Sequence, residues 1–272
     1  MSSMQATSAL DARNPAPLYE IEGVAFEAEG RVLLQPLSLT LEAGRMIALI
    51  GHNGSGKSTL LKLLARQQAP SHGSLRFSGR ALGAWSAREF ARRVGYLPQH
   101  PPLATGMSVR ELVALGRYPW HGALGRLRKE DHAMIEEALR VTDTARFASH
   151  MADQLSGGER QRAWLAMLVA QGASCLLLDE PTSALDIAHQ IDVLRLLRRL
   201  ADEHGLTVVI VLHDINLAAR FCDELVALHG GRLLMSGTPA QLMQSQVLEA
   251  IYGVCMDIVP HPHGSGTIAV VR

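Results

Sequence analysis

"GHNGSGKST" occupies residues 51–59 and directly follows the apolar run "RMIALI". Its spacing matches the pattern G-x-x-x-x-G-K-[ST], and it stands between a strand-like run and a helix-like one, which is the setting in which that pattern binds phosphate. Glycines allow backbone N–H groups to surround phosphate oxygens, Lys57 adds a positive charge, and the Ser58 hydroxyl can ligate Mg²⁺. The predicted phosphate-binding residues are Gly51, His52, Asn53, Gly54, Ser55, Gly56, Lys57, Ser58 and Thr59.

Five apolar runs around this loop are typical of buried strands. Each run is nearly continuous in apolar residues, whereas a half-solvated antiparallel strand would alternate. Helix-like segments separate the runs, and this order predicts an α/β fold with a mostly parallel sheet. The stretch 18–44 alternates better and predicts an antiparallel β layer at the front of the domain. The five runs are "RMIALIG", "RVGYLPQ", "SCLLLDE", "LTVVIVLHD" and "DELVALH".

Strand signals disappear over about residues 101–171, and helix signals replace them. Ser108 and Glu111 fit a capping box, and "KEDHAMIEEALRVTD" has the apolar spacing of a helix. We therefore predict a helical subdomain inserted into a core domain of residues 18–253. Residues 1–17 are predicted to be a disordered tail and residues 254–272 a C-terminal extension, while "GGRLLMSGTPAQLM" predicts a hairpin and a short helix.

Polar side chains end three of the predicted strands. Asp179 and Glu180 follow "CLLL", Gln99 follows "GYLP", and His213 follows "VIVL". Because parallel strands deliver their carboxyl ends to one edge of the sheet, these groups can converge on one ligand. Asp179 and Glu180 face opposite ways, so Asp179 is predicted to hold Mg²⁺ and Glu180 to polarise an attacking water. The alternative for Asp179 and Glu180 is that the pair only caps the next turn. The alternatives for His213 and Gln99 are an ordinary histidine and an ordinary turn residue.

"DQLSGGERQRAWLAM", residues 153–167, contains a second turn suited to an anion. Ser156 and Glu159 fit a capping box, so Ser156 has a structural explanation as a helix cap. Gly157 and Gly158 do not, because glycine in the first turn of a helix costs about 1 kcal/mol relative to alanine. Small residues at these positions suggest that another molecule approaches the backbone closely.

Composition limits the class of protein. The 272 residues carry a formal net charge of zero with no basic cluster, which disfavours nucleic acid as a partner. Cys175, Cys222 and Cys255 are widely spaced, as in proteins of a reducing compartment. The apolar runs are shorter than the roughly 18 residues of a membrane span, and the N-terminus has no export signal, so we expect a cytosolic protein.

The ordered motifs "GHNGSGKST", "YLPQ", "LSGGERQ", "LLLDEPTSALD" and "VLHD" resemble those of the ATP-binding subunit of ABC transporters over about residues 18–253. The resemblance implies a P-loop ATPase core and a head-to-tail dimer with two ATP molecules between the subunits. Each ATP would lie on the phosphate loop of one subunit and under Ser156, Gly157 and Gly158 of the other. Asp186 would lie at the dimer seam and His213 near the γ-phosphate. Gln99 would hold the magnesium together with Ser58 and Asp179, and would take part in catalysis with Glu180 and His213.

Longer segments, including "MSVRELVALGRYPWHGALGR" and "DEPTSALDIAHQ", are similar to the ATPases of bacterial ferric-hydroxamate siderophore importers. This similarity implies a membrane permease and, indirectly, a substrate-binding protein as partners, and a peripheral position on the cytoplasmic face of the inner membrane. Permease helices would dock near Gln99 and the helical insert, with Tyr118 and Trp120 either as interface anchors or as core residues. Import of haem, cobalamin or a catecholate siderophore remains an alternative, as does a soluble ABC ATPase acting on ribosomes or DNA.

The chain departs from the family pattern at one position. An aromatic residue upstream of the phosphate loop often stacks on adenine in this family, and Ala28 stands there, with Phe26 nearby. The paired histidines of "PHPHG" near the C-terminus could suggest a metal site, but a solvated tail is the simpler interpretation.

Overall fold

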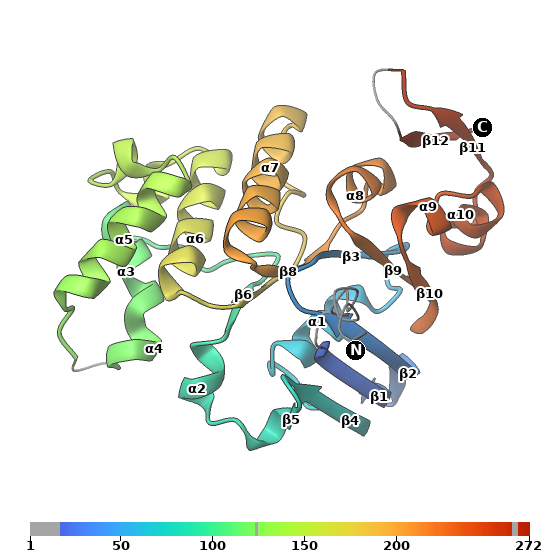
Figure 1. Cartoon of the computed structure of the whole chain (residues 1–272), viewed down its shortest axis with the longest axis horizontal. Coiled ribbons are helices and arrows are strands. Elements are labelled where there is room, and N and C mark those ends of the chain that lie inside the picture. The colour runs from blue at the N-terminus through green and yellow to red at the C-terminus, as the bar shows by residue number, and fades with distance from the viewer. Residues whose placement is uncertain (1–16, 123–124, 263–265) are drawn as a thin grey trace, which may run out of the picture.

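The computed structural model describes residues 17–122, 125–262 and 266–272, and its central element is a six-stranded sheet (Figure 1). The five predicted strands are parallel to one another, and the sixth, β10, pairs antiparallel with β9. The predicted mostly parallel sheet is therefore confirmed. In spatial order the strands are β10 (Arg232–Gly237), β9 (Glu224–His229), β3 (Met46–Ile50), β8 (Thr207–Val211), β7 (Cys175–Leu178) and β6 (Val94–Leu97).

A second, antiparallel sheet forms the predicted front layer. Its strands, in order, are β2 (Arg31–Glu42), β1 (Pro17–Ala28), β4 (His72–Phe77) and β5 (Arg80–Ala81), of which the sequence predicted only the first two. The predicted tail ended at residue 17, but Pro17 pairs with Glu42 and already belongs to β1. Residues 1–16 lie outside the described part of the chain.

The helix after the phosphate loop lies between the two sheets. Helix α1 (Lys57–Leu64) buries Leu60, Leu61, Leu63 and Leu64 in one apolar cluster with residues of both sheets. The Tyr19 hydroxyl of β1 donates a hydrogen bond to the Leu64 carbonyl at 3.1 Å. Helix α1, into which the phosphate loop leads, is therefore fixed by packing on two sides.

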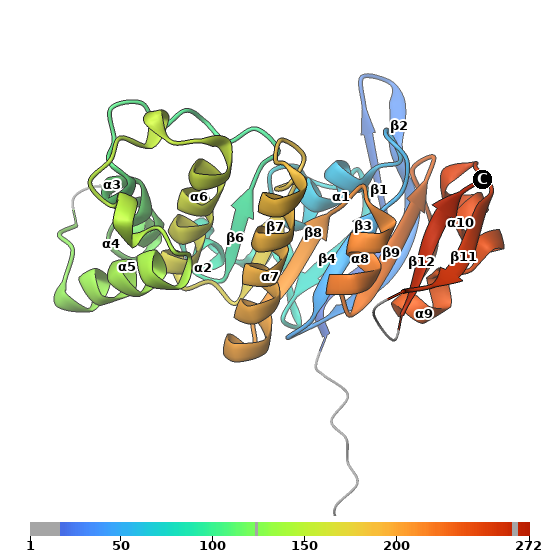
Figure 2. The ribbon, with the colours of Figure 1, turned by 90° about the horizontal axis from the view of Figure 1, so that it is seen from above.

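The opposite face of the six-stranded sheet is covered by α7 (Ile187–His204), α8 (Ile215–Phe221) and part of α6 (Gly157–Gln171) (Figures 1 and 2). The apolar stripe of α7, which includes Leu194 and Leu197, is buried against the sheet. This packing holds the helices that follow β7 and β8 close to the strand ends.

The predicted helical insert is a separate cluster at one end of the molecule (Figure 2). The capping box of Ser108 and Glu111 is present at the start of α3. Trp164 of α6 packs against both the helical cluster and the core of the main sheet, so the insert is joined firmly to it. Its helices are α3 (Val109–Ala114), α4 (Tyr118–His121), α5 (Lys129–Val141) and α6; the remaining short helices between β5 and α6 are α2 (Ala87–Ala91) and the 3₁₀ turns η1 (Leu82–Ala84), η2 (Leu115–Arg117), η3 (Ala145–Phe147) and η4 (Ala152–Gln154).

The C-terminal elements lie at the other end of the molecule (Figure 1). The predicted hairpin and short helix are present as β9–β10 and α9 (Pro239–Leu242), followed by α10 (Ser245–Tyr252). The extension after residue 253 forms an antiparallel pair, β11 (Met256–Pro260) and β12 (Thr267–Val271), which we call the C-terminal hairpin. Across the described ranges, every helix is too short or too polar to cross a membrane.

Candidate functional site

The phosphate loop connects β3 to α1 and depends on its glycines. Gly51, Gly54 and Gly56 have φ angles of 140°, 77° and 99°, a region that residues with a Cβ rarely occupy. A Cβ on Gly51 would also lie 2.1 Å from the Leu228 carbonyl oxygen. A side chain at Gly51 would therefore displace the loop, and the positive φ angles of Gly54 and Gly56 favour glycine there.

Lys57 is folded back over the loop. Its ammonium group donates hydrogen bonds to the Gly51 and His52 carbonyls, each at 2.9 Å, and the side chain is almost fully buried. Burial lowers the pKa of Lys57 from its usual value, against the raising effect of Glu180 and Asp179. The Lys57 ammonium group is thus fixed beside the phosphate pocket, where it can pair with a bound anion.

Two oxygen donors meet beside the loop. The Ser58 hydroxyl donates to Asp179 Oδ1 at 2.8 Å, and Asp179 is only 2% exposed. Burial raises the pKa of Asp179, partly offset by the Ser58 hydrogen bond, so the carboxylate is poorly solvated. A hydroxyl and a carboxylate oxygen are ligands that Mg²⁺ prefers. A bound cation would also offset the cost of burying the negative charge of Asp179. The donor set therefore fits magnesium.

The polar side chains that follow β6 and β8 both contact Glu180. Gln99 Nε2 donates to Glu180 Oε2 at 2.7 Å, and His213 Nε2 lies 2.8 Å from Glu180 Oε1. Gln99 thus contacts Glu180, whereas Asp179 pairs with Ser58, so the two adjacent carboxylates hold different positions as the strand alternation predicted. Glu180 has a φ angle of 49°, an unusual conformation for a residue with a side chain. Such conformations are concentrated at functional sites.

Two pockets share Glu180. One, of about 180 Å³, is lined by residues 53–59, Leu33 and Glu180. The buried Ser55 hydroxyl has no hydrogen-bond partner among the described residues, which suits an incoming acceptor. The other pocket, of about 200 Å³, is lined by Glu180, residues 99–103, Gly157 and neighbouring residues of α6 and the turn after β7. Gly157 therefore lines a different pocket from the one lined by the phosphate loop of its own chain.

The second anion-suited turn has the predicted cap. The Ser156 hydroxyl accepts from the Glu159 backbone N–H, and the Glu159 carboxylate accepts from the Ser156 N–H at 3.0 Å. The two glycines that follow differ. A Cβ on Gly158 would lie 2.5 Å from His189 Cδ2, whereas one on Gly157 would meet nothing closer than 3.9 Å. Packing within the chain therefore explains Gly158, and Gly157 has no such explanation.

Asp186 lies next to this turn through His189. The Asp186 carboxylate caps α7 by accepting from the His189 backbone N–H at 2.9 Å, and it lies 2.8 Å from His189 Nδ1. The same imidazole fills the space beside Gly158. His189 lies in the quoted segment "DEPTSALDIAHQ", but no role was predicted for it, so sequence reasoning missed the residue that joins the two predicted dimer-seam segments.

Leu33 and His229 are two further residues that sequence reasoning missed. Leu33 is 40% exposed and lines the phosphate pocket from β2. His229 ends β9, and its ring lies 4.5 Å from that of His52, centroid to centroid. The only sequence signal for Leu33 was an apolar residue where the alternation of the strand predicts a polar one. The signal for His229 was a polar residue at the end of a parallel strand.

Ala28 and Phe26 do not line the phosphate pocket. Phe26 is partly buried against the front core, which accounts for it without a nucleotide. In the helical insert, Tyr118 is 58% exposed, whereas Trp120 donates from Nε1 to the Gln171 carbonyl at 2.9 Å. Trp120 is therefore bonded within the fold although it is 36% exposed, and a role of either residue as an interface anchor stays a prediction.

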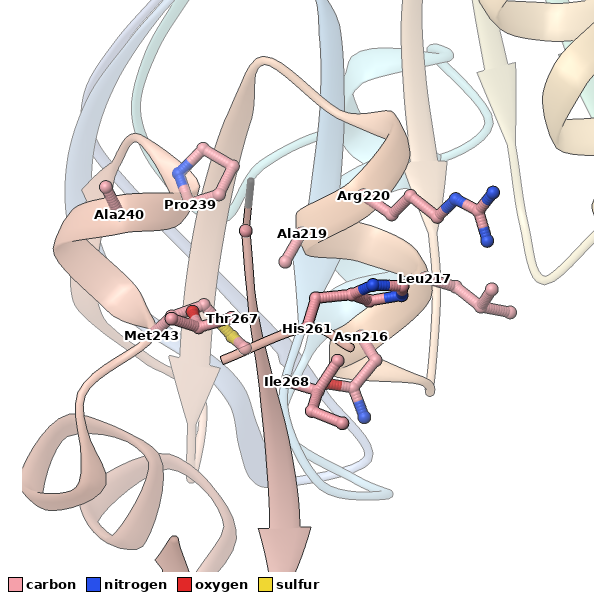
Figure 3. Close-up of a pocket in the computed structure, with 11 residues that line it drawn as sticks. Asn216, Leu217, Ala219, Arg220, Pro239, Ala240, Met243, His261, Thr267 and Ile268 are labelled. Carbon is pink, nitrogen blue, oxygen red and sulfur yellow. The ribbon is translucent and has the colours of Figure 1, made fainter. Parts of the chain in front are cut away.

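A larger cavity, of about 640 Å³, lies between α8, α9 and the C-terminal hairpin (Figure 3). None of the predicted site residues lines it, although α8 begins immediately after His213. Of the paired histidines in "PHPHG", His261 lines this cavity, and the second lies outside the described residues. Within the described ranges, no three His, Cys, Asp or Glu side chains are grouped as a metal site.

A glycine-rich loop between a strand and a helix, a buried lysine, and two carboxylates at the same sheet edge define a phosphate-loop nucleotide-binding protein. A family model described as "ABC transporter" matches residues 34–183, more than half of the chain, and the chain belongs to this family of ATP-binding transporter subunits. With this family membership, the recognition from motifs and the predicted ATPase fold are confirmed.

The chain is similar to several named importer ATPases. It is 43% identical to the achromobactin transport ATP-binding protein CbrD of Dickeya dadantii over 232 residues, which cover 85% of this chain and 86% of that protein. It is 41% identical to the iron(3+)-hydroxamate import ATP-binding protein FhuC of Bacillus subtilis over 232 residues, 85% of this chain and 86% of the relative. It is 40% identical to the hemin import ATP-binding protein HmuV of Pseudomonas entomophila over 260 residues, 94% of this chain and 100% of the relative.

Solved structures give the same fold. A metal-chelate type ABC transporter in an inward-facing conformation matches with a TM-score of 0.82 and 28% identity, over 94% of this chain and 97% of that chain. A dimeric ATP-binding cassette, MJ0796, bound to ADP and Pi, matches with a TM-score of 0.70 and 27% identity, over 81% of this chain and 98% of that chain.

Proposed function

We propose that this chain is the ATP-hydrolysing subunit that powers import of an iron(III)-siderophore, a ferric hydroxamate in particular, through a membrane permease. The observation that carries the ATPase half is the position of Glu180, whose carboxylate is held by Gln99 at 2.7 Å and lies 2.8 Å from His213, beside the phosphate pocket. The similarity to CbrD and FhuC supports the cargo half.

The chemistry follows from the side chains in place. Lys57 and the backbone N–H groups of the loop would bind the phosphates, and Glu180, fixed from two sides, would orient and polarise the attacking water. His213 would lie close enough to the terminal phosphate to donate a hydrogen bond to it. Ser58 and Asp179 would hold Mg²⁺, which when bound supplies positive charge on the phosphate oxygens. Positioning and electrostatics of this kind supply most of the catalysis in phosphoryl transfer.

The site requires a second copy of the chain to be complete. Gly157, the residue after Ser156, lines a pocket that contains no phosphate-loop residue of its own chain, while the N-terminal N–H groups of α6 remain suited to an anion. In a head-to-tail dimer these groups would cover the ATP bound to the partner subunit's phosphate loop, with Asp186 at the seam. Closure of the dimer would then couple ATP binding to the permease.

Permease helices would dock on the side of the helical insert. The pocket next to Gln99 is bordered by Leu103, which is 76% exposed, and Tyr118 is exposed on the same subdomain. A peripheral position at the cytoplasmic face of the inner membrane would follow from this docking. A periplasmic substrate-binding protein would then act only through the permease.

Replacing Glu180 with Gln tests the ATPase assignment. The variant keeps the side-chain volume and the contact with Gln99 but removes the charge, so it should bind ATP and lose at least about 100-fold in turnover while accumulating as an ATP-bound dimer. The matched control is Glu136→Gln, an exposed carboxylate on α5, which should keep its activity. Turnover in Glu180→Gln close to wild type would remove Glu180 from this role.

Replacing Gly157 with Asp tests the dimer. A side chain at this position meets no close contact in the isolated subunit, so folding and single-site ATP binding should be preserved. The added carboxylate would repel the partner's γ-phosphate, and ATP-driven dimerisation measured by analytical ultracentrifugation should be lost. Loss of ATP binding by the monomer would instead place Gly157 in its own subunit's site.

Cargo is tested by growth of a strain that lacks this gene. It should fail on ferric hydroxamate as sole iron source and recover with the wild-type gene but not with the Glu180→Gln form. Haem is a second candidate, because HmuV is 40% identical over 94% of this chain. Normal growth on ferric hydroxamate with failure on haem would replace the first cargo with the second.

A further inference from the structure

The C-terminal hairpin is attached to the helix that begins next to His213. Asn216 lies in the first turn of α8, three residues after His213. Its side chain donates from Nδ2 to the Ala269 carbonyl at 3.0 Å and accepts at Oδ1 from the Ala269 N–H at 2.7 Å. The carboxamide thus pairs with one residue of β12 as a neighbouring strand would.

The backbone between His213 and Asn216 is itself fixed. Asp214 caps α8 by accepting hydrogen bonds from the N–H groups of Asn216, at 2.7 Å, and Leu217, at 3.0 Å. A displacement of Asn216 is therefore passed through its hydrogen bond with Asp214 to His213, the residue before Asp214. His213 Nε2 in turn lies 2.8 Å from the Glu180 carboxylate.

Apolar packing also holds the hairpin, because Met256 of β11 is buried in the core of the main sheet. Ile258 and Ala269 pack against the main core, but the cavity of about 640 Å³ separates much of the hairpin from α8 and α9 (Figure 3). Val270 and Val271 of β12 are 47% and 60% exposed. The two hydrogen bonds of Asn216 therefore give the hairpin a polar attachment to α8 itself, in addition to this packing.

The C-terminal part of the chain also reaches the phosphate loop. His229 Nδ1 lies 3.1 Å from the Ile251 carbonyl of α10, and the His229 ring is in edge contact with the His52 ring of the loop. Helix α10 continues into β11 of the hairpin. The hairpin is thus connected to the site at both the His213 side and the phosphate-loop side.

We propose that Asn216 is a positioning residue, and that the C-terminal hairpin, held by its carboxamide, keeps His213 against Glu180. The proposal rests on the proposed ATPase function, in which His213 and Glu180 act on the terminal phosphate and water. It assigns a role in catalysis to a part of the chain outside the nucleotide-binding motifs.

Asn216→Ala tests the proposal. Both hydrogen bonds to Ala269 are lost, and kcat for ATP hydrolysis should fall about tenfold because a small displacement of a catalytic group costs this much or more. KM for ATP should change less than about twofold, since the phosphate-loop contacts are retained. Asp257→Ala is the matched control: it removes the hairpin's exposed contact with Arg272, at 2.9 Å, without touching α8, and it should leave both constants unchanged.

The same link can be broken from the other side. Ala269→Pro removes the N–H that donates to Asn216, in a strand that has one free edge and whose extended backbone suits proline. Its kcat should fall as well, and the double variant should be no slower than Asn216→Ala, because the two changes remove one shared interaction. Additive losses would contradict the link.

Hydrogen exchange of α8 separates this proposal from the proposed function. Alanine is a better helix former than asparagine, so a purely local effect of Asn216→Ala would slow exchange across residues 215–221. Release of the hairpin would speed exchange in α8 and β12, whether or not the protein hydrolyses ATP. Faster exchange combined with a wild-type kcat would refute the positioning role alone. Absence of ATPase activity in the wild-type protein would refute the proposed function. In that case the exchange result would still decide whether Asn216 holds the hairpin on α8.

Discussion

The carboxylate of Asp131 should be a main stabilising group of the helical insert. It is 3% exposed at the start of α5 and lies 2.9 Å from Arg117 Nε and 2.7 Å from His121 Nε2. It also accepts from the Arg128 backbone N–H at 2.8 Å. Asp131→Asn keeps the volume of the side chain but removes its charge. In addition, the new NH₂ group would face the hydrogen-bond donors that the second carboxylate oxygen of Asp131 now accepts from.

The expected cost follows from what remains buried. Removing one partner of a buried ion pair costs about 3–5 kcal/mol, because the other charge is left uncompensated. Arg117, only 8% exposed, would keep its hydrogen bond to the Ala170 carbonyl at 2.9 Å and its contact with the Trp120 ring. We therefore expect the low end, about 3 kcal/mol of unfolding free energy.

Urea unfolding at pH 7 measures this difference, with Glu136→Gln on the same helix as the control. Glu136 and its partner Arg110 are 57% and 47% exposed, and such pairs contribute up to about 1 kcal/mol. A loss in Asp131→Asn no larger than in the control would refute the reasoning, as would a variant within about 1 kcal/mol of wild type.

The pH dependence gives an independent check. Burial alone would raise the pKa of Asp131, but hydrogen bonds from the Arg128 N–H, His121 and Arg117 outweigh it and hold the pKa well below its usual value. Since the folded pKa is depressed, this stabilisation is complete above the unfolded pKa of about 3.9 and is lost as the pH falls towards the folded value. The difference between wild type and Asp131→Asn should therefore be constant from about pH 7 to 5 and shrink below about pH 4.

Three further outcomes can be measured on single variants. Gly157→Ala should stabilise the isolated subunit by up to about 1 kcal/mol through helix propensity, whereas Gly158→Ala should destabilise it by about 1 kcal/mol or more, because the new methyl group meets the His189 ring; equal effects in urea unfolding would contradict this difference. Asp179→Asn should raise the Tm of the nucleotide-free protein by a few degrees, since burial raises the pKa of this carboxyl and so disfavours its charge, while magnesium-dependent ATP binding measured by calorimetry weakens; a lower Tm would be the wrong sign. Tyr118→Ala should leave the free energy of unfolding within about 0.5 kcal/mol of wild type but reduce co-purification with the permease, and full assembly would remove Tyr118 from the interface.

The parts of the fold that could be predicted from sequence are those in which burial produces a clear pattern of apolar residues. Every residue of β3, β7 and β8 is buried, so each strand is a continuous apolar run that helical segments separate. Strand β4 buries only Leu75 and Phe77, and β11 buries only Met256. Strand β4 is held by backbone pairing with the distant strand β1, and β11 by pairing with its neighbour β12. Backbone pairing leaves little trace in the residues of a strand.

The same reason separates the predicted and missed parts of the site. Gln99 and His213 could be placed near Glu180 because parallel strands end at one edge. The pairing of Asn216 with Ala269 spans 53 positions along the chain and involves the backbone of an alanine, so no side-chain pattern indicates it. A packing contact such as that between Gly158 and His189 likewise depends on how two helix ends approach in space.

The two glycines after Ser156 show how the structure changes the weight given to a motif. From sequence, both are equally unfavourable in a helix and equally in need of an explanation. In the structure a Cβ on Gly158 would collide with His189, which itself lies 2.8 Å from Asp186, so this glycine allows α6 and α7 to begin side by side. Gly157 has open space beside it and lines a pocket with Glu180. No packing contact of the described residues explains glycine at this position, so the contact of Ser156, Gly157 and Gly158 with the partner's nucleotide stays a prediction, and the packing of Gly158 on His189 is what holds this turn in place.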